Sequence, residues 1–120
     1  MRMQIGSDGV ILVELPGGPG LSRVLESAIS RVHDREDYDV VVDFRQVTIV
    51  TSRSLAPLLR LRELLRYRGK RLLLCGLSPT TRGIFSVTAL DGVFEIVGDR
   101  DEALVALQAQ AISPTAVESV

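Results

Sequence analysis

The sequence predicts an α/β fold: one domain with a mixed sheet of four or five strands and about four helices. Short apolar runs alternate with segments of helical periodicity in the order β-β-α-β-α-β-α-β-α, which is typical of parallel strands joined by right-handed helical crossovers. The chain has 120 residues, and 46% of them are hydrophobic, which is enough for one core. Only 4% are aromatic, so the core must be built mainly from aliphatic side chains.

The N-terminal part of the chain predicts a hairpin, a turn and a helix. Residues 3–5 and 10–13 are the expected strands of the hairpin. The run at 16–20 is rich in glycine and proline, and we interpret it as a turn because it lacks the Lys-Ser/Thr ending of a phosphate-binding loop. Apolar residues from Leu21 to Val32 recur at spacings of three and four, which predicts an amphipathic helix.

Two continuous apolar runs, 40–42 and 72–75, predict strands that are buried on both faces of the sheet. Asp43 could be a catalytic carboxylate, but the sequence offers it no partner for acid–base chemistry, so we expect a cap or loop hydrogen bond. The single cysteine, Cys75, is expected to be a small buried hydrophobe, which suits a reducing, cytoplasmic setting.

A long amphipathic helix is predicted between these strands, running to about Arg68 with Gly69 in the C′ position. Pro57 lacks an N–H group and fits only near the helix start, which places the N-cap between Ser52 and Ser54. The free N–H groups and the helix dipole at that end favour an anion, so a hydroxyl there is either a plain cap or a phosphate carrier. The hydroxyl residues at this junction are Thr51, Ser52 and Ser54.

The exposed side of this helix and the turn after it are basic, with Glu63 as the only acidic residue among them. This stretch holds seven of the 14 basic residues of the chain, and the imbalance favours an acidic partner surface. Nucleic acid is disfavoured, because the net charge is −1 and no groove-reading motif accompanies the arginines. The basic residues are Arg53, Arg60, Arg62, Arg66, Arg68, Lys70 and Arg71.

The C-terminal part predicts two more helices and one strand. Ser78 is the expected N-cap, with Pro79 first, of a helix whose apolar contacts are Ile84, Phe85 and Val87. Residues 95–97 are the expected last strand, and Asp99 is the expected cap of a final helix over 100–111. We expect one domain over residues 1–112 and a flexible tail over residues 113–120.

Several functional classes receive little support from the sequence. One cysteine and one histidine leave no plausible zinc set, so we expect no metal and no cofactor. No apolar run is long enough to span a bilayer, and the N-terminus lacks the apolar core of a signal peptide, so we expect no membrane insertion. A small enzyme or nucleotide binder would rest only on the glycine–proline run and Asp43, so we expect no enzyme.

Taken together, the order and spacing of several segments resemble the STAS domain family, and within it the bacterial anti-sigma factor antagonists. No single segment is specific, but their arrangement is. They are residues 40–44, 47–55, 68–79 and 88–97, with Glu102, Ala103 and Leu104 opening the last helix.

The resemblance implies a regulatory domain that works by partner switching. In that family a Ser or Thr at the strand-to-helix junction is phosphorylated by a serine kinase that is also the anti-sigma factor, and the unphosphorylated domain binds that partner and frees the sigma factor. The implied phosphoacceptor here is Ser52, with Ser54 and Thr51 as alternatives. A homodimer is also compatible with the resemblance. The implied partner-binding residues are Thr51, Arg53, Ser54, Pro57 and Arg60.

The junction departs from the family pattern in its charge. Where the family usually has an acidic residue before the acceptor, this chain has Thr51. Where the family usually has a small residue after the acceptor, it has Arg53. Relative to the family pattern, one negative charge is lost and one positive charge is gained. Ser54 and Ala56 stand where glycines are common. These changes motivate an alternative function, a non-phosphorylated STAS scaffold subunit of a sensory complex or of a membrane transporter.

Overall fold

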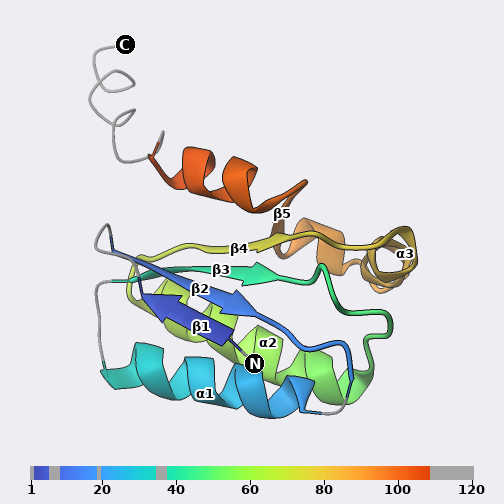
Figure 1. Ribbon diagram of the computed structural model, residues 1–120, viewed down its shortest axis with the longest axis horizontal. Helices are drawn as coiled ribbons and strands as arrows, with labels where there is room; N and C mark the ends of the chain where they lie inside the picture. Colours follow the sequence, from blue (N-terminus) through green and yellow to red (C-terminus); the bar gives the residue numbers. More distant parts are fainter. Residues whose placement is uncertain (1, 6–8, 19, 35–37, 109–120) are drawn as a thin grey trace.

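The computed structural model describes residues 2–5, 9–18, 20–34 and 38–108. Its sheet has five strands in the order β1-β2-β3-β4-β5 (Figure 1). The first pair is antiparallel and the other three pairs are parallel, so the predicted opening hairpin and mixed sheet are confirmed. The strands are β1 (Arg2–Ile5), β2 (Val10–Glu14), β3 (Asp39–Asp43), β4 (Leu72–Cys75) and β5 (Glu95–Val97).

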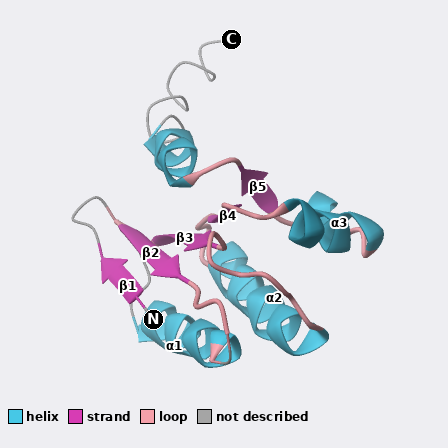
Figure 2. Cartoon of the chain, turned by 45° about the vertical axis from the view of Figure 1, so that its right-hand side comes forward, coloured by secondary structure: helices cyan, strands magenta, loops and turns pink. Residues whose placement is uncertain are grey.

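Helices cover both faces of this sheet. Helix α1 (Leu21–Asp34) and helix α2 (Ser52–Tyr67) lie side by side on one face, and a helical stretch over residues 100–108 lies over the other (Figures 1 and 2). Helix α3 (Pro79–Val87) and the short 3-10 helix η1 (Leu90–Gly92) connect β4 to β5. The predicted order of strands and helices is therefore confirmed, with η1 as an addition.

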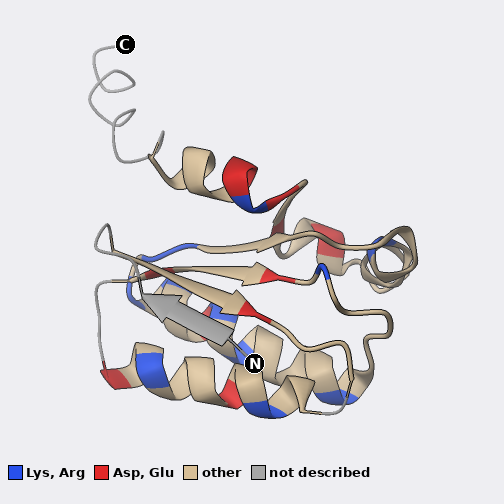
Figure 3. Ribbon diagram, viewed as in Figure 1, with Lys and Arg blue, Asp and Glu red and all other residues tan. Residues whose placement is uncertain are grey.

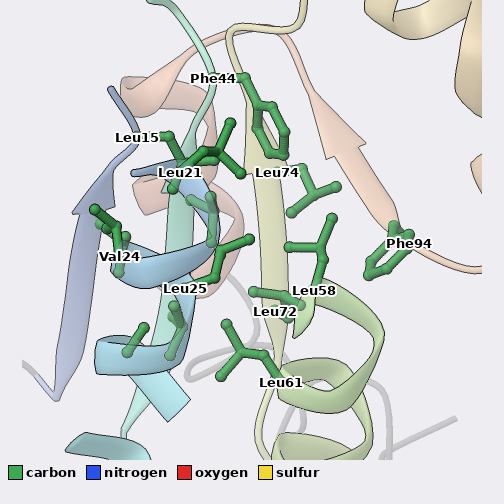
Figure 4. Close-up of a cluster of buried hydrophobic side chains, with 14 of the residues drawn as sticks. Leu15, Leu21, Val24, Leu25, Phe44, Leu58, Leu61, Leu72, Leu74 and Phe94 are labelled. Carbon is green, nitrogen blue, oxygen red and sulfur yellow. The ribbon is translucent and has the colours of Figure 1, made fainter. Parts of the chain in front are cut away.

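The central strands alternate their side chains between two cores, which confirms that they are buried on both faces. Val40 and Val42 pack with α1 and α2 in the larger core, which Figure 4 shows in close-up. Val41, between them, points to the opposite face and packs with Ala103 and Leu107 of the 100–108 helix. This alternation follows from the two-residue period of a strand.

Most of the predicted helix ends are also confirmed. The N–H of Thr81 donates to Ser78 Oγ at 3.2 Å, and the N–H of Glu102 donates to Asp99 Oδ1 at 2.8 Å. Gly69 follows α2 with φ +70°, in the left-handed region that glycine tolerates. Val87 differs from the expectation, because it is 89% exposed and makes no core contact.

Within the described residues, no helix is long and apolar enough to cross a bilayer. No group of three potential metal ligands occurs in that same part of the chain. The predicted end of the last helix and the tail over residues 113–120 lie outside the described residues, so the domain boundary at residue 112 stays a prediction.

Cys75 is fully buried, as expected, and this gives a pH-dependence prediction. Burial, assisted by the negative charge of Asp43, raises the pKa of its thiol from 9.0 to about 12. The unfolded thiol loses its proton first, so the stability that the protonated thiol contributes is present below pH 9.0 and is lost as the pH rises towards about 12. We expect urea unfolding to show a shallower alkaline loss of stability in Cys75→Ala than in the wild type, and an equal loss would contradict this.

Candidate functional site

Helices α1 and α2 begin at the same end of the molecule (Figure 1). A groove forms between their first residues. Its volume is about 470 Å³. The glycine-rich turn, the first turn of α1 and the loop before α2 contribute its walls. We call it the junction groove, and it is lined by Gly18, Gly20, Leu21, Ser22, Arg23, Ile49, Thr51, Arg53 and Ser54.

The structure corrects the predicted start of α2. Thr51 is the N-cap, with extended backbone angles, and its hydroxyl makes no capping bond. Its carbonyl oxygen accepts from the N–H groups of Ser54 at 2.9 Å and Leu55 at 3.1 Å, so helical hydrogen bonding already begins at Thr51. The N-cap expected between Ser52 and Ser54 is therefore wrong, and Ser52 is the first helical residue.

Pro57 lies further inside α2 than we expect for a residue without an N–H group. A side chain of α1 replaces the hydrogen bond that the proline removes. A proline cannot donate to the carbonyl four residues earlier, which here belongs to Arg53. The hydroxyl of Ser22 on α1 donates to that oxygen at 3.3 Å. This hydrogen bond links the starts of the two helices. The side chain of Pro57 is buried.

The three junction hydroxyls differ in accessibility. Thr51 and Ser52 are exposed, whereas Ser54 is only 8% exposed. The Ser54 Oγ lies 3.5 Å from Thr51 Oγ1, so it already has a polar partner. The backbone N–H groups of Ser52 and Arg53 donate to no described residue, which leaves donors at the helix start for an anion.

The junction groove is electropositive. Arg23 and Arg53 are the charged residues that line it, and no carboxylate is among the lining residues. The positive end of the α2 dipole adds to their effect. Arg60, one of the predicted partner-binding residues, lies further along α2 and forms an ion pair with Glu26 of α1, with Nη1 and Oε1 3.3 Å apart.

Ile49 is a candidate contact residue that the sequence analysis missed. Its side chain is 70% exposed beside Thr51, while Val47 and Val50 on either side of it are buried. An irregular loop has no fixed period, so a run of four β-favouring residues gave no sign of which would face solvent. The glycine-rich run that we interpret as a turn also contributes one wall of this groove, through Gly18 and Gly20.

Asp43 has the structural role that was expected of it. Its Oδ1 accepts from the N–H of Arg45 at 2.9 Å, which confirms the predicted loop hydrogen bond. Its Oδ2 accepts from Arg100 Nη2 at 2.9 Å, and Arg100 also pairs with Glu14 on β2. The two carboxylates raise the pKa of the Arg100 guanidinium further above its ordinary value. This cluster ties the last helix to the ends of β2 and β3.

Comparisons with known proteins agree with this architecture. Residues 19–98 match a family model described as Mlab, STAS domain. Comparison with curated proteins found no match.

Three solved structures illustrate the likeness in fold. An anti-sigma-factor antagonist (STAS) domain protein from Planctomyces limnophilus is 18% identical, with a TM-score of 0.78 over 89% of this chain and 97% of that one. The Bacillus cell fate determinant SpoIIAA in its phosphorylated form is 16% identical, with a TM-score of 0.69 over 88% and 97%. A sulfate transporter family protein from Wolinella succinogenes is 19% identical, with a TM-score of 0.73 over 88% and 89%.

Proposed function

The chain belongs to the STAS domain family, and we propose that it is a regulatory protein-interaction domain of the anti-sigma factor antagonist type. Its junction groove binds an anti-sigma factor or related serine kinase, and phosphorylation of Ser52 switches that binding. The observation that carries the proposal is the exposed hydroxyl of Ser52 at the first position of α2, beside a groove of about 470 Å³. The phosphorylated form among the similar structures supports the same mechanism.

The electrostatics of the groove explain how such a switch would act. A phosphate adds about −1.5 to −2 charges at neutral pH. That charge is tolerated by the fold, because the free N–H groups of Ser52 and Arg53 and the helix dipole favour an anion. It offsets the positive charges of Arg23 and Arg53 at the same time. The unphosphorylated groove fits a partner surface with an acidic rim and an apolar contact for Ile49. Phosphorylation would remove the charge complementarity of the two surfaces and weaken their binding.

Among the alternatives, Ser54 is a poorer acceptor than Ser52. A kinase must reach the hydroxyl, and Ser54 is only 8% exposed and already contacts Thr51. Phosphorylation there would place a dianion at a buried side-chain position, where desolvation disfavours charge. Thr51 is exposed and remains the second candidate.

Mass spectrometry of the protein from its native cells, with and without stress, is the direct test. We expect phosphate on Ser52 with an occupancy that changes, and we expect Ser52→Asp to weaken binding to the co-purifying partner by about tenfold or more. Ser52→Ala should retain binding because it adds no charge. Ser54→Ala controls for the choice of acceptor, because its buried hydroxyl is a poor kinase substrate and its loss should leave the phosphorylation of the protein unchanged. An unmodified Ser52 in every condition, together with unchanged binding by Ser52→Asp, would reject the switch.

One alternative function is favoured by specific observations, namely a constitutive scaffold subunit of a sensory complex or of a membrane transporter. Arg53, directly after Ser52, places a bulky cation beside the acceptor hydroxyl, where it would obstruct a kinase. The matching family model is the Mlab type, and one similar structure comes from a sulfate transporter family protein. A scaffold subunit should co-purify with its complex whether or not Ser52 is modified. In either function we assign the domain to the cytoplasm, without an enzymatic activity of its own.

A further inference from the structure

A second groove lies at the opposite end of α2 from the junction groove. Its volume is about 280 Å³, and four of its eight lining residues are cations. Figure 3 shows basic residues where α2 ends and β4 begins. We call it the basic groove, and it is lined by Arg62, Arg66, Lys70, Arg71, Leu72, Val93, Phe94 and Glu95.

Two of these cations are held by acceptors of the chain itself. Arg62 Nε donates to the carbonyl oxygen of Val93 at 2.9 Å, which ties α2 to the turn before β5. Arg71 Nε donates to Glu95 Oε1 at 2.9 Å. Both side chains are less than one-third exposed, at 28% and 24%. They therefore act as fixed walls of the basic groove.

The other two cations are left with little compensation. Arg66 is 70% exposed, and its ion pair with Glu63 is a loose one, with Nη1 and Oε1 3.6 Å apart. Lys70 forms no ion pair with any residue that the structure describes. Glu95 is the only carboxylate that lines the groove, and it is already engaged by Arg71. The least compensated positive charge of the groove thus lies at Arg66 and Lys70.

We propose that the basic groove is a second protein-interaction site, which takes an acidic segment of a partner protein. The charge of its rim is complementary to carboxylates, and Leu72, Val93 and Phe94 provide an apolar floor. A nucleotide is a poorer match, because Phe94 is the aromatic residue among the lining residues and is only 5% exposed, too little for a base to stack on.

The position of the basic groove makes this site separate from the junction. Helix α2 has 16 residues, which corresponds to about 24 Å at the usual rise per residue. The two grooves therefore lie at opposite ends of α2 and share no lining residue. Binding at the basic groove does not depend on the modification of Ser52. This inference goes beyond the proposed switch and survives its failure.

Fluorescence anisotropy with a labelled peptide of alternating glutamate and leucine tests the proposal on the full chain. We expect binding that Arg66→Glu combined with Lys70→Glu weakens by about tenfold or more, and that added salt also weakens. Arg31→Glu combined with Arg82→Glu is the matched control, with the same change in net charge on exposed residues outside the groove. It should bind as the wild type does. Thermal unfolding of both variants verifies that each is folded.

NMR locates the peptide on the wild-type protein. Amide shifts should appear at residues 70–72 and 93–95, which border the basic groove. Shifts confined to residues 49–54, equal losses in the two double variants, or no binding by the wild type would each overturn the proposal. Inorganic phosphate that binds the groove when the peptide does not would overturn it as well, because the ligand would then be a small anion.

Discussion

Replacing Phe85 with alanine is expected to lower the free energy of unfolding by about 3–5 kcal/mol. The ring is fully buried and makes edge contacts with Phe44 at 6.3 Å and with Phe94 at 5.8 Å between centroids. The lost free energy has two parts. The first is the hydrophobic contribution of burying a large aromatic side chain, and the second is the cost of the cavity left among α3, the end of β3 and the start of β5, which cannot close completely. Urea unfolding of the variant and the wild type measures the difference.

Val87→Ala on the same helix is the control for this prediction. Its side chain is 89% exposed, so its loss should change stability by no more than about 0.5 kcal/mol.

Phe44 directly follows β3 and begins the loop that leads to Thr51. A loose ring cluster should therefore also weaken partner binding at the junction groove. A Phe85→Ala variant as stable as Val87→Ala would show that the three rings do not form a packed unit.

Replacing Arg100 with leucine is expected to cost about 2–3 kcal/mol of stability. The variant leaves the carboxylates of Asp43 and Glu14 without their shared cation, and the Asp43 side chain is only 6% exposed. We expect less than for a fully buried pair, because Arg100 is 30% exposed and Arg45 Nη2 lies 3.9 Å from Asp43. Urea unfolding at neutral pH gives the value.

A double-mutant cycle with Asp43→Asn isolates the pair. The loss caused by Arg100→Leu should be smaller in the Asp43→Asn background, because the amide carries no charge to be left unpaired. Equal losses in both backgrounds would mean that Arg100 stabilises the last helix by packing alone.

Local signals in the sequence predicted most of the fold correctly. The caps at Ser78 and Asp99 depend on residues within three positions of each hydroxyl or carboxylate, and both hydrogen bonds are present. The end of α2 just before Gly69 is set by neighbouring residues in the same way. The burial of the central strands follows from apolar residues that are neighbours in the chain. The order of the elements and the mixed sheet followed from these patterns, and the structure has both.

The start of α2 was predicted wrongly because its determinant lies elsewhere in the chain. Pro57 is tolerated at the sixth helical position since Ser22, 31 residues before Arg53, donates to the carbonyl that the proline leaves without a partner. The exposure of Ile49 is likewise fixed by what its loop packs against, because Val47 and Val50 contribute to the core and Ile49 does not.

The sequence by itself determined the order of the strands and helices and the burial of the central strands. It also gave the excess of arginine in and after α2, but the tertiary structure alone decided which of these cations are compensated. Arg60 is paired with Glu26, 34 residues away, whereas the side chain of Lys70 forms no ion pair with any described residue. Caps and periodicity depend on neighbours along the chain, whereas charge pairing and the walls of a groove depend on distances that exist only after the chain has folded.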